Sequence, residues 1–451
     1  MRALFAVLIL ALAGCAAEWQ GDYDRLAADL SYSSRFTGAI ERNDSPSTDQ
    51  ELDRMLSEPL DLELLIKIAK DRNPELKEML ARAKAGVQEV RRAGALDDPM
   101  LKYEAWGVPI NKPTAFNQDQ TNMIGLRQNF PFPGNQSLKS EAALRDAESM
   151  YQMYRDRQLD VISRLKKAYL DYYSMDREIA IHLEHVKIMG DMEKISDIKF
   201  RNGTVSQQDV LKPQVELIML HNDVLAMSQH VESAKAAINA LLSRPPESPL
   251  GKPRELAFPD EKFDVQELSA KALDRPDVLA AQFKARSTET MGKVASREGN
   301  LPDFSIGADY WQQPGAPNDA YGLMFSINLP WFTGKHGAEV AKVEHTLRAD
   351  QAAVETAKNK ALYEVRDAFL RVEAARKSLI LFKGELVPKS AQSVEVSRAN
   401  YEKDKASFLD LLDAERSLRD VKLKYSQALV QYEMSVADLE RAVGTALRRK
   451  S

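Results

Sequence analysis

The sequence predicts a mainly helical chain that carries a few short β-strands and is built by internal duplication. The 451 residues contain only 20 Gly and 20 Pro and are rich in Ala, Glu, Lys, Leu and Arg, a balance typical of long helices. A heptad pattern of apolar residues occurs twice, and four short segments alternate apolar with polar residues. Together these observations indicate paired long helices with short strands between them.

The N-terminus reads as an export signal followed by a lipid-attachment cysteine. Arg2 supplies a positive start, and residues 4–12 form an apolar stretch too short to span a bilayer as a helix. The sequence LAGC ending at Cys15 is similar to a bacterial lipobox, and Cys15 is the single cysteine of the chain. We therefore expect residues 1–14 to be a removable signal peptide and Cys15 to carry a covalent lipid. An ordinary signal peptide with an incidental cysteine is the alternative.

The residues after Cys15 bear on location and partners. Ala16 and Ala17 stand where an inner-membrane retention signal of enteric lipoproteins has aspartate, which favours the outer membrane of a Gram-negative bacterium. Residues 15–58 show little periodicity and are expected to form a lipidated, loosely ordered lead. The net charge of −5, without a basic patch, argues against nucleic acid as a partner.

Short helices and a hairpin precede the long helices in each half of the chain. Residues 59–80 and 263–283 both begin with an Asp-capped short helix and continue after a proline, and a connector with five prolines, 244–262, separates the halves. We therefore expect a first structural repeat at 59–259 and a second at 260–445.

Each repeat contains a predicted β-hairpin, at 99–132 and at 303–332. The alternating segments are 99–107, 122–132, 303–312 and 321–332. Ten-residue segments with apolar and polar faces, and with aromatic residues near their ends, are typical of transmembrane barrel strands. Because four strands cannot close a barrel and open edges do not survive in lipid, other copies must complete it. Two chains would give eight strands and three would give twelve; a small soluble sheet with an aromatic core is the alternative.

Long helices follow each hairpin, over roughly 136–200 and 335–401. A helix of about 65 residues reaches on the order of 95 Å, which no globular core requires. Each returns through a second helix, giving helical hairpins at 136–243 and 335–443. Pro388 is expected to kink or divide the second long helix.

The two turns between these helices carry one motif, 201 residues apart in the chain. Ser206 is followed by Asp209, and Ser407 by Asp410, each pair ahead of an apolar run. Ser-x-x-Asp is typical of a helix start, where the side chains accept hydrogen bonds from free backbone amides. Apolar residues then recur every seven positions in the same register in both copies, which predicts coiled-coil packing and an internal duplication.

These features together resemble the TolC-type outer-membrane factors, the exit ducts of tripartite efflux pumps and type I secretion systems. The resemblance covers about 59–445 and includes Asn-Pro-Glu-Leu at 73–76, Asn-Leu-Pro-Trp-Phe at 328–332 and its counterpart at 129–132. It implies a homotrimer whose four strands per chain form a 12-stranded barrel, continued by a long periplasmic α-helical coiled-coil tunnel.

The resemblance also implies partners and cargo. A periplasmic adaptor (membrane fusion) protein and an inner-membrane RND-type pump would deliver metal cations or small toxic compounds, which the duct conducts passively. Segments 93–99, 244–246 and 334–339 are most similar to the heavy-metal-efflux branch of the family. A type I secretion duct is the alternative within the family, and a coiled-coil periplasmic lipoprotein without a channel is the alternative outside it.

By the resemblance, the two turns are the periplasmic tips that narrow the duct and meet the adaptor. Asp209, Tyr401 and Asp413 fall on positions that hold the tips closed through hydrogen bonds and salt bridges. The tip arginine of the family is replaced here by Ala406, with Lys405 as the nearest charge, and helix capping alone is the other interpretation of the aspartates. The candidate tip residues are Gly203, Ser206, Asp209, Tyr401, Asp404, Lys405, Ser407, Asp410 and Asp413.

No motif for nucleotide binding, metal-dependent proteolysis or a catalytic nucleophile occurs, and the chain is not expected to be an enzyme. His182 and His185 share a helix face, as do Met189 and Met192, but we interpret them as facing solvent or the lumen. No catalytic or metal-binding residue is assigned, and no cofactor is expected besides the lipid on Cys15.

Overall fold

The computed structural model describes residues 19–39, 49–107, 121–258, 260–312, 319–332, 334–403 and 405–447. Within them the chain is mainly helical and contains one four-stranded antiparallel sheet, so the predicted secondary-structure class is confirmed. The chain divides into two compact units, each built from three separate segments. Unit 1 comprises the residues up to Ser33, Met79–Tyr154 and Asp277–Ala357. Unit 2 comprises Ser34–Glu78, Arg155–Pro276 and the residues from Lys358 onward.

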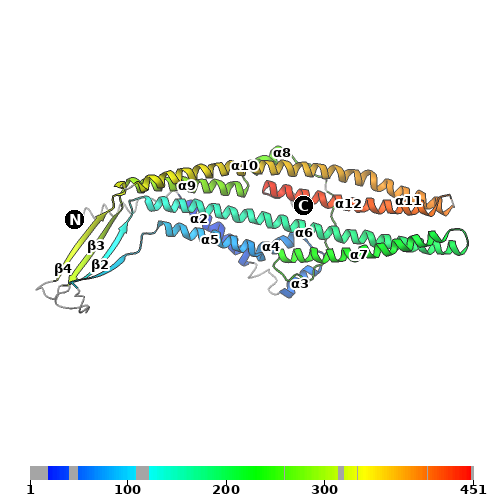
Figure 1. Ribbon diagram of the computed structural model, residues 1–451, viewed down its shortest axis with the longest axis horizontal. Coiled ribbons are helices and arrows are strands. Elements are labelled where there is room, and N and C mark those ends of the chain that lie inside the picture. The colour runs from blue at the N-terminus through cyan, green and yellow to red at the C-terminus, as the bar shows by residue number, and fades with distance from the viewer. Residues whose placement is uncertain are drawn as a thin grey trace. The chain divides into compact units, whose positions relative to one another are not determined.

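Unit 1 contains the sheet, whose strands lie in chain order with every pair antiparallel (Figure 1). The strands are β1 (Met100–Trp106), β2 (Thr121–Phe130), β3 (Phe304–Gln312) and β4 (Ala320–Ile327). The two predicted hairpins are thus present, and they are joined through β2 and β3, from Asn122 opposite Gln312 to Phe130 opposite Phe304. The last strand is shorter than predicted, because Pro330–Phe332 forms a 3₁₀ turn that proline favours over a sheet.

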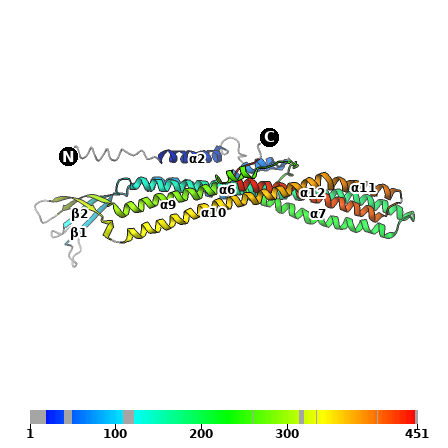
Figure 2. The ribbon, with the colours of Figure 1, turned by 90° about the horizontal axis from the view of Figure 1, so that it is seen from above.

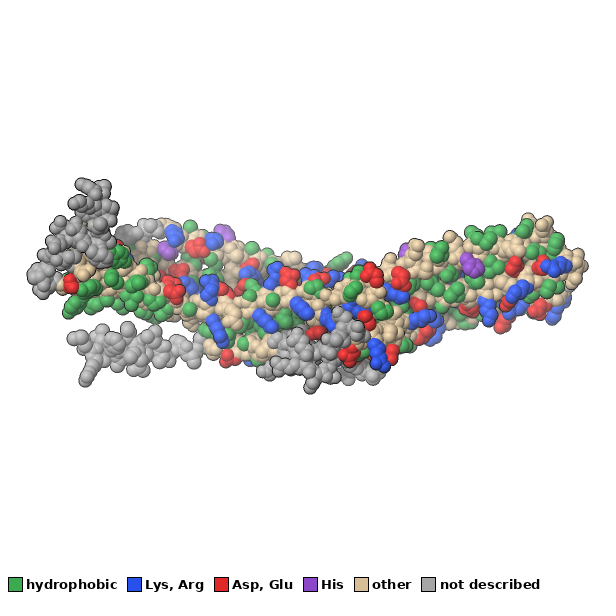
Figure 3. Space-filling view, turned by 90° about the horizontal axis from the view of Figure 1, so that it is seen from below, with side chains coloured by type: hydrophobic (Ala, Val, Ile, Leu, Met, Phe, Trp, Pro, Cys, Tyr) green, Lys and Arg blue, Asp and Glu red, His purple; other side chains and the backbone are tan. Residues whose placement is uncertain are grey.

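The sheet has one apolar face that is exposed in the single chain. The register places Tyr103, Ile124, Tyr310 and Tyr321 in one row across the four strands, and all of them are exposed. Hydrophobic side chains accordingly gather over the strands in the space-filling view (Figure 3). The opposite face carries polar groups: Lys102 pairs with Glu104, and Ser305 bonds Ser326 across β3 and β4. The predicted alternation is therefore present in all four strands, with exceptions such as Met123 on the polar face and Asn122 on the apolar face.

The lead to the first repeat is helical, and the prediction of a loosely ordered segment at 15–58 is wrong for the part that the structure describes. Helix α2 (Gln20–Ala39) buries Tyr23, Leu26 and Leu30 in unit 1, and α3 (Asp49–Ser57) belongs to unit 2. The spacing of three and four residues between these buried side chains is helical, and sequence reasoning overlooked it.

The helices of both repeats follow one order. In the first repeat α4 (Leu62–Arg72) and α5 (Pro74–Gly94) precede the hairpin, and α6 (Asn135–Arg201) and α7 (Gln207–Leu241) follow it. In the second repeat α8 (Val265–Ala272) and α9 (Pro276–Asn300) precede the hairpin. The helices that follow it are α10 (Lys335–Leu381), α11 (Val387–Glu402) and α12 (Phe408–Val443). None of the helices in the described ranges is both long and apolar enough to cross a bilayer.

The second long helix is interrupted as Pro388 predicts. A π-helical turn, Phe382–Leu386, separates α10 from α11, and the amide of Val387 donates to the carbonyl of Phe382. Proline has no amide hydrogen and crowds the preceding turn, so widening the helix just before it accommodates the ring. Within unit 2, the turns from α6 to α7 and from α11 to α12 lie side by side at one end (Figure 2).

Candidate functional site

The first turn is shaped by a glycine and an aspartate. Helix α6 ends at Arg201, and Gly203 adopts φ +72°, a left-handed conformation that favours glycine. At the start of α7, the backbone amide and hydroxyl of Ser206 donate to Oδ2 of Asp209 at 3.0 and 2.9 Å. The carboxylate therefore ties the chain entering the helix to its first turn, as the Ser-x-x-Asp motif predicts.

The second turn repeats this geometry. The amide and hydroxyl of Ser407 donate to Oδ2 of Asp410 at 2.9 and 2.8 Å, and the amide of Asp410 donates back to Oγ of Ser407 at 3.2 Å. The hydrogen bonds from Ser407 hold the pKa of Asp410 below its usual value. The amide of Lys405 donates to the carbonyl of Asn400 at 2.8 Å, and its side chain is exposed. Asp404 lies outside the described residues.

Behind the second turn lies a buried apolar layer. The rings of Tyr401 and Phe408 meet edge to face at 5.9 Å between centroids, and Nζ of Lys199 lies 4.1 Å from the centre of the Tyr401 ring. In the part of the chain that the structure describes, the Tyr401 hydroxyl has no hydrogen-bond partner. Within one chain it is therefore bonded to neither Asp209 nor Asp413. The layer consists of Met189, Met192, Leu220, Tyr401, Phe408, Leu411 and Leu412.

A buried carboxylate lies on α7, one helical turn before Leu220 of this layer. Glu216 has a side chain only 7% exposed, and it bonds Arg416 at 2.5 Å and Arg419 at 2.9 Å, both on α12. Burial alone raises the pKa of Glu216, but the two guanidinium groups outweigh it and hold that pKa below its usual value. We call these three residues the Glu216 cluster.

Sequence reasoning missed this cluster. Its one local signal is Glu216 itself, an acidic residue inside the apolar run Val-Glu-Leu-Ile-Met-Leu at 215–220. The arginines lie 200 and 203 residues further along the chain, and no local pattern pairs them with it.

Two histidines on α6 lie next to the cluster and are buried, so the interpretation of His182 and His185 as facing solvent or the lumen is wrong. Burial and the charge of Arg419 lower the pKa of both, that of His185 to about 4. Nδ1 of His182 and Nε2 of His185 lack hydrogen-bond partners in the described structure. Met189 and Met192 are buried as well, in the apolar layer.

Two more ion pairs surround the cluster. Nη2 of Arg398 on α11 lies 2.8 Å from Oε1 of Glu415 on α12, which is buried. Nζ of Lys422 on α12 lies 2.9 Å from Oε1 of Glu184 on α6, and this pair is largely exposed. The residues described here include no group of three or more His, Cys, Asp or Glu that could hold a metal ion.

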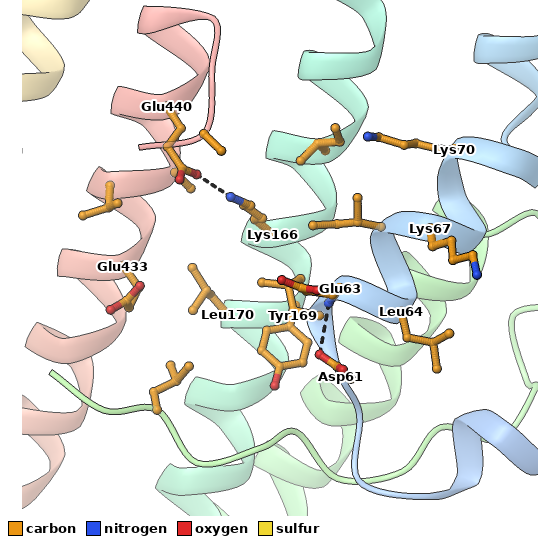
Figure 4. A pocket seen from close by; sticks show the side chains of 17 residues that line it. Asp61, Glu63, Leu64, Lys67, Lys70, Lys166, Tyr169, Leu170, Glu433 and Glu440 are labelled. Carbon is orange, nitrogen blue, oxygen red and sulfur yellow. Dashed lines mark hydrogen bonds and ion pairs between the residues drawn. The ribbon is translucent and has the colours of Figure 1, made fainter. Parts of the chain in front are cut away.

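A separate cavity of about 800 Å³ opens between α4, α6 and α12 of unit 2. Lys166 pairs with Glu440 at its edge, and Tyr169 and Leu170 line its wall (Figure 4). The hydroxyl of Tyr169 accepts from the amide of Arg254 at 2.9 Å, and burial raises the pKa of that hydroxyl. These contacts join the helices to the connector between the repeats, and we assign the cavity no chemistry.

The predicted lipid site, Cys15, lies outside the described residues, but the segment after it is anchored. Nε1 of Trp19 donates to Oγ of Ser137 at 3.3 Å, and Nη1 of Arg145 lies 2.9 Å from Oδ2 of Asp22. Both contacts fix the start of α2 to the first turns of α6, which follows β2 directly in unit 1.

Comparison with known proteins assigns the chain to a family. A family model described as outer membrane efflux protein matches residues 65–244 and 268–445. The chain is 22% identical to outer membrane protein OprJ of Pseudomonas aeruginosa over 468 residues, covering 97% of this chain and 95% of that protein. It is also 22% identical to the cobalt-zinc-cadmium resistance protein CzcC of Cupriavidus metallidurans over 246 residues, which covers 54% and 57%.

Solved structures share the fold. The outer membrane protein VceC of Vibrio cholerae superposes with a TM-score of 0.72 at 19% identity, over 86% of this chain and 97% of that one. CusC gives a TM-score of 0.73 at 17% identity, over 87% and 94%. The predicted TolC-like fold is therefore confirmed, and the chain belongs to the outer membrane efflux protein family.

Proposed function

We propose that this protein is the outer-membrane exit duct of a tripartite efflux system. The observation that carries the proposal is the sheet, whose exposed apolar face suits lipid and whose opposite face is polar. A coiled-coil lipoprotein that only spaces the envelope would have no use for such a sheet. The family match supports the same function.

Three copies complete the duct in this proposal. Within the described sheet, β1 and β4 each have a neighbouring strand on one side only. An unpaired strand edge cannot face lipid, because its backbone groups would lack hydrogen-bond partners there. Three chains give twelve strands and a lumen wide enough for solutes, whereas eight strands fill their interior with side chains. Helix α7 also leaves apolar side chains exposed that a neighbouring copy would cover: Leu211, Val215, Ile218, Met219 and Leu225.

A lipid on Cys15 would hold the duct at the membrane. Trp19 is four positions after Cys15, which spans at most about 14 Å. The acyl chains would therefore enter the bilayer close to the end of unit 1 where Trp19 contacts Ser137.

Metal cations are the cargo that we propose first, with small toxic compounds as the second class. The support is the similarity to a cobalt-zinc-cadmium resistance protein. In this proposal the turns at 201–207 and 402–408 meet the periplasmic adaptor, and an inner-membrane RND-type pump supplies the cargo.

Deletion of the gene tests the proposal. We expect the deletion strain to become more sensitive to zinc, cobalt or cadmium, and the wild-type gene to restore resistance. Leu323→Arg should fail to restore it, because Leu323 is 87% exposed on the apolar face and a cation there costs about 2–4 kcal/mol in lipid. Ser326→Arg, on the polar face of the same strand, is the matched control and should restore resistance. Equal behaviour of the two variants would contradict a membrane-facing sheet.

A further inference from the structure

One face of α6 carries two histidines and two methionines in a buried stripe. His182, His185, Met189 and Met192 follow one another by three, four and three positions, a spacing that places side chains on one face of a helix. The histidines are 5% and 3% exposed, and the methionines 0% and 7%. Both methionines pack into the apolar layer with side chains of α7, α11 and α12. We call these four residues the His–Met stripe; they have no part in the proposed duct.

The histidines of the stripe leave nitrogen atoms free. In the described structure, Nδ1 of His182 and Nε2 of His185 are buried without a hydrogen-bond partner. A buried polar atom in this state costs about 1–3 kcal/mol, and an ion or a water molecule can supply the missing partner. The two residues are one turn apart, where Cβ atoms lie about 5–6 Å from each other. One small ion can therefore reach both rings.

The charges around His182 permit a bound cation. Burial and the charge of Arg419 lower the pKa of His182, which keeps the ring in the neutral form that binds metals. Three carboxylates act in the opposite direction, one each from α7, α6 and α12: Asp223, Glu178 and Asp420. Nη2 of Arg419 also lies 3.0 Å from Oδ1 of Asp420, which offsets its charge. The acidic groups thus outnumber the basic ones at this ring.

The charges at His185 and the types of ligand select a soft, singly charged ion. Arg419 and Arg416 act on His185 against one carboxylate, Glu216, and they oppose a divalent cation about twice as strongly as a monovalent one. Zn²⁺ would also need a third His, Cys or carboxylate, and the described residues contain no such group of three. The long side chain of Met189 leans toward the preceding turn, where His185 lies. Imidazole nitrogens and a thioether suit Cu⁺ or Ag⁺.

We propose that His182, His185 and Met189 form a binding site for a soft monovalent cation, Cu⁺ or Ag⁺, in the helical interior of unit 2. The two imidazole nitrogens and the thioether sulfur are its three donors. Helices α6, α7 and α12 enclose the site within one chain, so a bound ion stabilises their packing. The inference goes beyond the proposed function and does not depend on it, because the site needs neither conductance nor a second copy of the chain.

Equilibrium dialysis of the purified protein against Ag⁺ in chloride-free buffer at pH 7 tests the site. Met189→Leu nearly conserves the buried volume but removes the sulfur, and it should weaken the binding of one Ag⁺ per chain by at least about tenfold. His185→Leu should abolish that binding. Met153→Leu on α6, at a side chain 49% exposed, and His230→Gln, at an exposed position of α7, are the matched controls and should bind Ag⁺ like the wild type.

Thermal unfolding of the same samples separates loss of the site from loss of the fold. Excess Ag⁺ should raise the thermal midpoint of the wild type and of both controls, but not that of His185→Leu. Every sample contains Cys15, so the difference between samples reports the His–Met stripe alone. Silver binding that Met189→Leu and His185→Leu leave unchanged would overturn the proposal. So would a wild-type protein that binds no silver, which would leave water as the partner of the two nitrogens. Neither result bears on the duct, because conductance is not measured.

Discussion

The first and second turns share their capping geometry but differ in what lies behind them. In both, a serine amide and hydroxyl donate to an aspartate three residues later, at 2.8–3.0 Å. Phe408, which follows the second serine, is buried among side chains of four helices, whereas Gln207, which follows the first, is exposed. The comparison teaches that a duplicated motif preserves local hydrogen bonding while the two copies diverge in packing.

The largest expected effect comes from removing the packing that only the second turn has. Phe408→Ala should lower the free energy of unfolding of the hairpin end by about 3–5 kcal/mol, because it empties a buried site. Gln207→Ala, at the equivalent position of the first turn, should change it by no more than about 0.5 kcal/mol. Thermal unfolding in detergent measures both, and equal losses would show that the two turns are packed alike.

Acid should weaken the interior behind both turns. The folded-state pKa of His185 is about 4, below the 6.5 of an ordinary histidine, so the unfolded chain takes up the proton first as the pH falls. Stability should therefore be level above pH 6.5, fall by about 3 kcal/mol down to pH 4 and then level off for this group. The pKa of Glu216 is also lowered, so this group adds a further loss of stability only as the pH falls below 4.5, the pKa of an ordinary glutamate.

His185→Leu removes one titrating group and should make the profile between pH 6.5 and 4 less steep, while the fall from His182, whose pKa is also lowered, remains. His230 is exposed on α7, so His230→Gln should leave the slope as it is in the wild type. Thermal midpoints of the wild type and of both variants, measured across this pH range, give the three slopes. A wild-type profile that is flat in this window would contradict the buried, neutral state of His185.

A smaller and equal effect is expected from the two caps. Asp209→Ala and Asp410→Ala should each cost about 1 kcal/mol, the usual value for a lost helix cap. Hydrogen exchange of the amides in the first turns of α7 and α12 reports each cap separately. A clear difference between the two variants would mean that the two caps stabilise their helices by different amounts despite their shared geometry.

The smallest effect on stability is expected at Ala406. Ala406→Arg adds a charged side chain at a partly exposed position, so the free energy of unfolding should change by no more than about 0.5 kcal/mol. A cation added to this turn, seven positions before the exposed Asp413, whose side chain is 74% accessible, should nevertheless lower channel conductance. Conductance that stays at the wild-type level would show that the turns themselves do not restrict passage.

Features that depend on neighbouring residues could be predicted from the sequence, and features that depend on distant residues could not. The caps and Gly203 depend on neighbouring residues, and the strands depend on a period of two, so both were accessible without a structure. The Glu216 cluster depends on partners some 200 positions away, and the burial of His185 depends on α12 packing over α6. Helix α2 was missed for a different reason: the spacing of Tyr23, Leu26 and Leu30 is helical but too short to stand out in a polar segment.

The central claim is that copies of this chain form a duct through the outer membrane. Planar-bilayer recording of the purified, detergent-solubilised protein tests it most directly, with the oligomeric mass determined on the same sample. The account predicts stepwise conductance from the fraction whose mass is three times that of one chain, and none after Leu323→Arg prevents insertion. A trimer that inserts without conducting, or a monomer as the sole species in mild detergent, would contradict the account.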